Sequence, residues 1–346
     1  MSTLITEATL NFKIGKKIGK GGEGEVYEAE DHQLNAILAV KKVAHSKFKD
    51  ESLFFEESKK LYLTRHRNVV EVNYGCKDDD HIYLAMPFYQ NGSLKGICDK
   101  RFLSSREIIR YGLQFLSGLH HIHSKGLIHF DVKLENILIS KSNQALISDF
   151  GLAQYTGGYG FSKVFGTTQV YAPPELFDQA EHNLKFDIYQ AGITLLRMCI
   201  GDNVFAHQIN QAFIKRKVKA DAHFIERLKN GQFPDRSFHF SHIPKPLRKV
   251  IANALHPDPN QRYDTVLEMQ NDLAKIKDSN DWLFITDFKG NDTWTDGDRE
   301  VNATFDGTNW SVKSMKNKRQ KKDFCQVKLN NSEKNSLLYK AFMSKW

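Results

Sequence analysis

The sequence predicts an α+β protein in which a small β-rich lobe is followed by a larger helical lobe and a short β-rich C-terminal extension. Residues 12–43 alternate apolar and polar side chains in the manner of half-buried strands. Residues 105–126 instead repeat apolar side chains with the period of an amphipathic helix. Near residue 280 the composition changes, because all four tryptophans lie between positions 282 and 346. Together these patterns indicate two lobes and an appendage.

The first lobe is expected to contain five strands and one helix. Three strands are predicted within residues 12–43, at FKIGKKIG, EVYEAE and AILAVKKV, and two more at VVEVNYG and HIYLAMPF. Residues 50–65 have a helical period, which brings Leu53, Glu57 and Leu61 near one face.

The second lobe is expected to be mostly helical. The helix within 105–126 begins with serines suited to capping and stops at Gly126. Further helices are expected at 184–200, 208–218, 244–255 and 263–277. The most apolar of them is interrupted by Arg197 and is too short for the run of about 20 apolar residues that spans a bilayer, so a buried core helix is the better interpretation.

The extension divides by charge and contains a hairpin signal. Residues 282–306 carry six acidic and two basic side chains, whereas residues 307–346 carry two acidic and ten basic ones. Two alternating runs flank Asp306-Gly307 within 299–315, which predicts a β-hairpin, and the last residues predict a short helix. The basic cluster at 316–322, near Trp310 and Phe324, would suit a nucleic-acid partner, although basic runs are usually solvated strand ends or loops. Docking on one of the protein's own lobes, on a substrate or on a partner protein is the favoured role.

The whole chain has the composition of an ordinary globular protein. It has 346 residues, a net charge of +8 and a hydrophobic fraction of 40%. Its four cysteines are scattered without a CxxC pair, and its first residues lack the apolar core of a signal peptide. These features predict reduced thiols and a cytoplasmic protein.

A glycine-rich turn between the first two predicted strands is the first candidate for chemistry. The segment IGKGGEGEV (18–26) carries Gly19, Gly21, Gly22 and Gly24. Because a strand and not a helix follows, the segment does not fit the dinucleotide fingerprint. Glycines instead allow backbone N–H groups to approach phosphates closely.

A lysine and a carboxylate could continue this phosphate site. Lys41 lies on the third predicted strand, where its ammonium group could contact the α- and β-phosphates of a nucleotide. Glu57, on the predicted helix, is the favoured ion-pair partner of Lys41, and the adjacent Glu56 is the alternative.

The segment HFDVKLEN (129–136) contains the residues that phosphoryl transfer requires. Asp131 could accept the proton of an attacking hydroxyl, and Lys133 could stabilise charge on the transferred group. Asn136 could hold a divalent ion together with Asp149, which begins DFG thirteen residues further on. Such a set supplies positioning and positive charge, which dominate catalysis of this reaction.

With APPE (172–175), DIYQAG (187–192) and DPNQRY (258–263), these motifs resemble the eukaryotic-type (Hanks-type) serine/threonine protein kinases in order and spacing. The resemblance implies the bilobal protein-kinase fold over residues 8–280, with an N-lobe at 8–88 and a C-lobe at 89–280. Residues 281–346 resemble no family that we recognise.

The resemblance also implies functional roles and cofactors. ATP and Mg²⁺ are expected, with Mn²⁺ possible. The expected catalytic residues are Asp131, Lys133, Lys41, Glu57 and Thr168, and the expected metal ligands are Asn136 and Asp149. The expected ATP-binding residues are Ile18, Gly19, Gly21, Gly22, Gly24, Val26, Ala39, Lys41, Met86, Phe88 and Leu138. Glu175 should pair with Arg262, Asp187 should cap the catalytic loop, and Leu61, His129 and Phe150 should stack.

The expected reaction is transfer of the γ-phosphate of ATP to Ser or Thr of proteins, and to the protein itself. A pseudokinase scaffold acting through the extension is the alternative, but Lys41, Asp131 and Asp149 are all present. Phe130 departs from the family, which commonly has Arg there to pair with a phosphate on the activation loop. Because Phe cannot form that ion pair, we expect activity that does not depend on phosphorylation of this loop.

Overall fold

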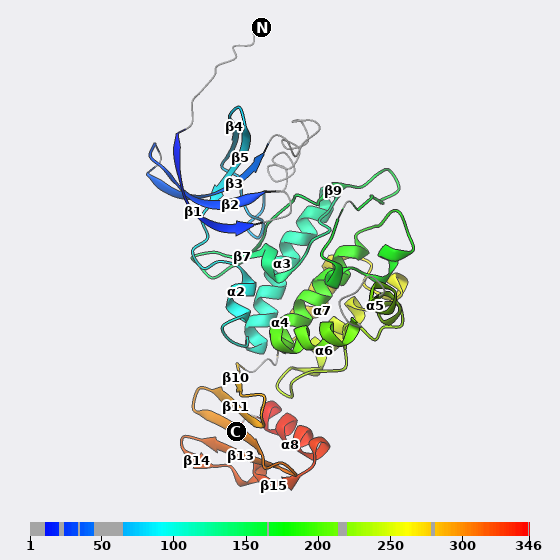
Figure 1. The fold of residues 1–346 in the computed structure, drawn as a ribbon. Helices are drawn as coiled ribbons and strands as arrows, with labels where there is room; N and C mark the ends of the chain where they lie inside the picture. The colour runs from blue at the N-terminus through cyan, green and yellow to red at the C-terminus, as the bar shows by residue number, and fades with distance from the viewer. Residues whose placement is uncertain are drawn as a thin grey trace.

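The computed structural model describes residues 11–20, 24–33, 35–44, 65–164, 166–213, 220–277, 281–344 and 346. In this part of the chain a β-sheet unit, a helical unit and a second β-sheet unit follow one another in sequence and in space (Figure 1). The predicted helix at 50–65, which includes Leu53, Glu56, Glu57 and Leu61, falls on residues that the structure does not describe up to position 64.

The N-terminal unit is an antiparallel sheet with the strand order β1-β2-β3-β5-β4. Its strands are β1 (Phe12–Lys20), β2 (Glu25–Asp31), β3 (Ala36–Ala44), β4 (Tyr74–Lys77) and β5 (His81–Pro87). All five predicted strands are present, although the fourth begins at Tyr74 and not at the valines of VVEVNYG. Val69 and Val70 are buried, and Val69 forms a bridge to Ile147 of the helical unit, so these valines join the two lobes.

The second unit contains most of the helices and two small strand pairs. The helices are α2 (Leu94–Cys98), α3 (Ser105–Ser124), α4 (Lys185–Ala212), α5 (Ala220–Lys229), α6 (Lys245–Ala254) and α7 (Val266–Ala274). Strand β6 (Leu127–Ile128) pairs with β9 (Gln154–Tyr155), and β7 (Ile137–Ile139) pairs with β8 (Ala145–Ile147). Short 3-10 turns lie at η2 (Leu134–Asn136), η3 (Gln169–Tyr171), η4 (Pro174–Phe177) and η5 (Pro259–Gln261). Helix α3 begins as predicted, since Ser104 and Glu107 form a reciprocal capping box.

The helix predicted at 184–200 is confirmed, because a kink at Gly201 ends it, whereas the helix predicted at 208–218 begins earlier, directly after that kink, and ends at Ala212 among the described residues. One segment, α4, runs from Lys185 to Ala212, and only Gly201 inside it leaves the helical dihedral region, with φ of 75°. A Cβ atom at Gly201 would lie 2.5 Å from the ring of Phe102, so glycine is required there for both conformation and space. Helix α5 was not predicted, although Phe224, Ile225 and Leu228 recur at intervals of three and four and gave a short helical signal.

The extension forms a six-stranded antiparallel sheet and one helix, and its predicted hairpin and terminal helix are confirmed. The sheet order is β10-β11-β12-β13-β14, and β15 also pairs with β13. These elements are β10 (Leu283–Thr286), β11 (Asn291–Asp296), β12 (Arg299–Phe305), β13 (Trp310–Lys316), β14 (Arg319–Gln320), η6 (Lys322–Phe324), β15 (Gln326–Leu329) and α8 (Asn331–Met343). The hairpin closes where Phe305 pairs with Trp310 across the turn at 306–309.

The extension packs against the helical unit through aromatic side chains. Trp294 is buried, and its indole N–H donates to Nδ1 of His242 at 2.9 Å. Phe284 packs on Phe240 and on Phe102, with ring centroids 4.5 and 5.0 Å apart. The extension therefore docks on its own C-lobe, which is one of the three predicted modes. Trp310 is not a free stacking surface, because Lys334 lies 3.8 Å above its ring.

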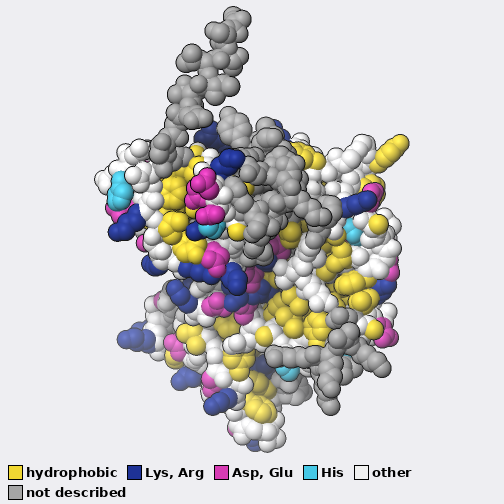
Figure 2. All heavy atoms as spheres, turned by 45° about the horizontal axis from the view of Figure 1, so that its top comes forward, with side chains coloured by type: hydrophobic (Ala, Val, Ile, Leu, Met, Phe, Trp, Pro, Cys, Tyr) yellow, Lys and Arg dark blue, Asp and Glu magenta, His cyan; other side chains and the backbone are white. Residues whose placement is uncertain are grey.

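Charge and hydropathy add two general features. On the face drawn in Figure 2, Lys and Arg side chains are interspersed with Asp and Glu side chains, so that face shows no single large basic field. Among the described residues, no helix has the length and apolar composition that crossing a membrane requires.

Candidate active site

A buried carboxylate on α4 holds the backbone of the catalytic loop. Asp187 accepts hydrogen bonds from the backbone N–H groups of His129 and Phe130, both at 2.8 Å, and from Nε2 of His123 at 2.7 Å. Its side chain is fully buried. The loop backbone is irregular at this point, and these bonds satisfy donors that no helix or sheet would pair. The predicted position of Asp187 beneath the loop is therefore observed.

Phe130 is strained in its backbone and fully buried in its side chain. Its φ of 64° lies in the left-handed region, where a bulky residue costs about 1–2 kcal/mol. The ring stacks edge-on against Phe186 at 5.0 Å and forms a small apolar cluster with Ile128, against which Leu152, Val164 and Leu176 pack. Leu152 and Val164 follow the DFG motif, so this cluster ties the activation segment to the catalytic loop without an ion pair.

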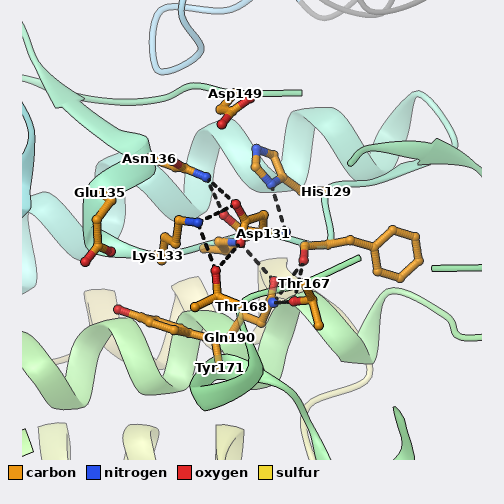
Figure 3. A network of polar contacts seen from close by, with 12 residues as sticks. His129, Asp131, Lys133, Glu135, Asn136, Asp149, Thr167, Thr168, Tyr171 and Gln190 are labelled. Carbon is orange, nitrogen blue, oxygen red and sulfur yellow. Dashed lines mark hydrogen bonds and ion pairs between the residues drawn. The ribbon is translucent and has the colours of Figure 1, made fainter. Parts of the chain in front are cut away.

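The predicted base, lysine, amide and threonine form one hydrogen-bonded network (Figure 3). Lys133 Nζ donates to Asp131 Oδ2 at 2.6 Å and to Thr168 Oγ1 at 2.9 Å. Thr168 Oγ1 donates in turn to Asp131 Oδ1 at 3.0 Å. Asn136 Nδ2 donates to the carbonyl oxygen and to Oδ2 of Asp131, at 2.9 and 2.8 Å. The Asp131 carboxylate is thus fixed in position by three side chains.

The two lobes meet through a lysine and a carboxylate. Lys41 Nζ lies 3.4 Å from Oδ1 of Asp149, whose side chain remains 43% exposed. Lost hydration is the largest single influence on Asp149 and opposes its charged form, but Lys41, His129 and the backbone N–H of Gly151 together outweigh it, so the pKa of this carboxyl is lowered. Behind Asp149, the ring of Phe150 is buried and lies edge-on to His129 at 5.2 Å. Two members of the expected stack are therefore together, and Leu61 lies outside the described residues.

The glycine-rich segment is described only at its two ends. Gly24 lies so close to β3 that a Cβ atom would be 2.5 Å from the backbone oxygen of Lys42. At Gly19 a Cβ atom would meet only Val26 at an ordinary 3.5 Å, so packing does not explain the glycine there. Gly21, Gly22 and the predicted partner Glu57 lie outside the described residues.

The other predicted ATP-binding residues lie on both lobes. Ala39 and Met86 are cross-strand neighbours on β3 and β5, and Val26 is opposite Lys41. Ile18 is an exposed residue of β1, and Phe88 directly follows β5. Leu138 is on β7, which belongs to the C-lobe. This distribution is what a nucleotide site between two lobes requires.

The predicted ion pair between the APPE segment and the C-lobe is present. Arg262 donates from Nη1 and Nη2 to the two carboxylate oxygens of Glu175, both at 2.7 Å. The Arg262 side chain is fully buried and also donates to the backbone oxygens of His256 and Pro257, at 2.7 and 3.0 Å. Such a fork-to-fork pair fixes orientation as well as distance.

Sequence reasoning missed Gln190. Its Oε1 accepts from the backbone N–H of Val132 at 2.9 Å, and its Nε2 donates to Phe130 O at 3.0 Å and to Thr167 Oγ1 at 2.9 Å. Gln190 is three residues after Asp187, so both point from the same face of α4. A polar residue at that spacing in an otherwise apolar helix was the available signal.

The donor set fits a divalent metal ion and a nucleotide phosphate. Both amide hydrogens of Asn136 point to Asp131, which leaves Oδ1 as the atom that could ligate a metal. Asp149 supplies a carboxylate that is partly exposed, and oxygen ligands of these types are those that Mg²⁺ prefers. Lys41 is close enough to share a phosphate with that ion.

Comparison with known proteins agrees with this geometry. Residues 12–273 match the protein kinase domain, and the chain belongs to the protein kinase family. Within the family it is a Hanks-type serine/threonine protein kinase by similarity. It is 28% identical over 274 residues to an Aurora kinase of Schizosaccharomyces pombe, covering 78% of this chain and 73% of that protein. It is 31% identical over 272 residues to the serine/threonine-protein kinase STE20 of Eremothecium gossypii, covering 76% of this chain and 26% of that protein.

One similar protein is described as inactive. The inactive serine/threonine-protein kinase PLK5 of Mus musculus is 27% identical over 268 residues, which cover 76% of this chain and 42% of that protein. Membership of the family therefore does not by itself decide whether a member is active, and the residues of the site must carry that argument.

Proposed function

We propose that this protein transfers the γ-phosphate of ATP to Ser or Thr hydroxyls of protein substrates and to itself, with Mg²⁺ as the usual metal and Mn²⁺ as a substitute. The observation that carries the proposal is the network around Asp131, in which Lys133, Asn136 and Thr168 all donate to one carboxylate. A protein that had lost catalysis would have no need to keep this carboxylate in three-point contact beside an intact Lys41–Asp149 pair.

Each residue has a defined task in the proposed reaction. When Mg-ATP is bound, ATP supplies the phosphoryl group, and Mg²⁺ supplies positive charge that offsets the negative charge of the phosphate oxygens. Asp131 orients the substrate hydroxyl and accepts its proton. Lys133 stabilises the negative charge on the oxygens of the transferred γ-phosphoryl group. Lys41 would hold the nucleotide phosphates, while Asn136 and Asp149 would hold the metal. Thr168 joins Asp131 to the activation segment, so that the base is positioned only when this segment is in place.

Regulation is proposed to differ from that of relatives with Arg before the catalytic Asp. The apolar cluster around Phe130 packs against Leu152 and Val164 of the activation segment. An Arg at position 130 could hold that segment only by pairing with a phosphate group on it. Activity should therefore survive removal of phosphate from the protein. Thr167 is unsuitable for testing this by mutation, because its hydroxyl donates to Phe130 O and accepts from Gln190. Phosphatase treatment is the better experiment.

The test of the proposed function is transfer of labelled γ-phosphate from Mg-ATP to the protein itself and to a generic basic protein. The Asp131→Asn variant is the control, because it keeps the size of the side chain and removes the base. Transfer by the wild type alone supports the proposal. If the wild type binds ATP but transfers nothing, the proposal fails and the scaffold alternative takes its place.

A further inference from the structure

A cavity of about 390 Å³ adjoins the catalytic network on the side of α4. Its lining includes Lys133 and Thr168, two of the three residues that hold Asp131. The far wall is apolar and includes Val170, Phe205 and Ile209. An extended peptide that places its hydroxyl at Asp131 must run within a few residues of this space, since each residue spans about 3.3–3.6 Å.

The cavity is also lined by two carboxylates, Glu135 and Asp202, and both form ion pairs with Arg197. Arg197 Nη1 lies 3.1 Å from Glu135 Oε1, and Arg197 Nε donates to Asp202 Oδ1 at 2.8 Å. Asp202 has a second cation, because Lys95 Nζ lies 2.7 Å from its Oδ2. The acidic residues beside the active site are therefore already paired with cations of the same chain.

Arg197 is held too firmly to turn away from these partners. Its side chain is only 7% exposed, and Nη1 also donates to the hydroxyl of Tyr171. The guanidinium carbon lies 5.3 Å from the ring centroid of Phe205, within the range of a cation–π contact. A basic substrate residue would have to compete with this guanidinium for Glu135, and an acidic one would meet two carboxylates.

We infer that this cavity is a substrate subsite for an uncharged apolar side chain within three residues of the phosphorylated Ser or Thr, and that Arg197 determines this preference by offsetting, together with Lys95, the charges of Glu135 and Asp202. The inference rests on the proposed kinase function and goes beyond it by naming a class of substrate. Arg197 acts here on specificity and touches none of the reacting atoms.

A positional-scanning peptide library around a fixed Ser or Thr, phosphorylated with labelled ATP, tests the inference. At one position within three of the acceptor, the wild type should favour Leu, Ile, Met or Phe over Lys and Asp by about tenfold or more, as apolar pockets discriminate. Arg197→Met should free Glu135, while Asp202 keeps Lys95, and should raise the rate with Lys or Arg at that same position until it matches or exceeds the rate with Leu. Uniform incorporation at every position by the wild type would overturn the inference.

A second variant keeps the test valid if Arg197→Met does not fold. Ala206 is an exposed residue that lines the cavity, so Ala206→Glu adds a third carboxylate to its lining while Arg197 is retained. This variant should shift the same position of the library towards Lys and Arg by several-fold. Asn203→Glu is the matched control, since Asn203 is exposed on the same helix but does not line the cavity, and its preference should equal that of the wild type.

Two failures can be distinguished with the same preparation. If the wild type phosphorylates itself or a generic basic protein while the library shows no selectivity, or if Ala206→Glu and Asn203→Glu behave alike, the subsite inference is wrong and the kinase function stands. If the wild type phosphorylates no peptide, no protein and not itself, both are wrong.

Discussion

The apolar side chain of Phe130 should contribute several kcal/mol to the free energy of unfolding, although its backbone conformation is unfavourable. The ring is fully buried and contacts Phe186 edge-on, and the cluster includes Leu152 and Val164 of the activation segment. Truncation of a buried Phe to Ala costs about 3–5 kcal/mol through lost burial and the cavity left behind. We therefore expect Phe130→Ala to lower the free energy of unfolding by about 3–5 kcal/mol.

The left-handed backbone provides an internal check on this value. At φ of 64° an Ala retains a strain of about 1 kcal/mol, whereas a Gly does not. Phe130→Gly should consequently be more stable than Phe130→Ala by about 1 kcal/mol, although Gly removes more of the side chain. Phe130→Arg should be less stable than either, because a guanidinium would be buried among apolar side chains without a partner.

Urea unfolding followed by far-ultraviolet circular dichroism measures these differences, and phosphate transfer before and after phosphatase treatment measures their effect on activity. The wild type should keep its activity after phosphatase treatment, and Phe130→Ala should lose activity both before and after it. A cost below about 1 kcal/mol for Phe130→Ala would show that the cluster does not hold the segment. Loss of wild-type activity on dephosphorylation would refute the proposed mode of regulation.

Three further predictions concern other parts of the molecule. Gly24→Ala should destabilise the protein, since the new methyl group would overlap the backbone of β3. Gly19→Ala has room for its methyl group and should fold normally, but it should raise the KM for ATP. Thermal unfolding measures the first effect and steady-state kinetics the second. Arg262→Met should cost about 3–5 kcal/mol in urea unfolding because it leaves the buried Glu175 carboxylate unpaired, and adding Glu175→Leu should recover most of the loss. Burial is the main cause that lowers the pKa of His242 to about 3, and the nearby Arg248 is the second. Because the unfolded chain binds a proton at about pH 6.5 and the folded protein does not, the free energy of unfolding should decline as the pH falls from about 6.5 towards 3. The loss should reach about 2 kcal/mol at pH 5 in urea unfolding followed by tryptophan fluorescence, and His242→Asn, which keeps an acceptor for Trp294, should show a smaller dependence on pH.

Residues that are close in sequence to a motif were the ones that sequence reasoning could place. Asp131, Lys133 and Asn136 lie within six positions, so their mutual contacts follow from one short loop and its ordered motif. Thr168 and Asp149 could be added because the family pattern fixes their roles. The outcome at Phe130 was predictable only in part: an ion pair could be excluded from the residue type, but the cluster that replaces it depends on Phe186, far away along the chain.

The packing of the extension could not be predicted for the same physical reason. Its tryptophans indicated that large apolar side chains would be buried, but the residue type does not say against which surface they pack. Trp294 donates a hydrogen bond to His242, and Phe284 packs against Phe102. In the sequence, most of the C-lobe lies between Phe102 and Phe284. No periodicity within residues 282–346 encodes those choices.

The polar residues of α4 show what a closer reading of the helical period would have yielded. Positions 187, 190, 194 and 197 recur at intervals of three and four, so they form one stripe on the part of α4 before Gly201, where the other buried residues are apolar. The structure shows the stripe facing the catalytic loop in order: Asp187 binds the backbone at 129 and 130, Gln190 that at 130 and 132, Thr194 the carbonyl oxygen of 132, and Arg197 the side chain at 135. A rigid helix thus acts as a template for an irregular loop, whose polar groups would otherwise be unsatisfied in the core. Because the last residue of the stripe reaches the cavity beside the active site, one element fixes both the catalytic base and the charge that a substrate meets there.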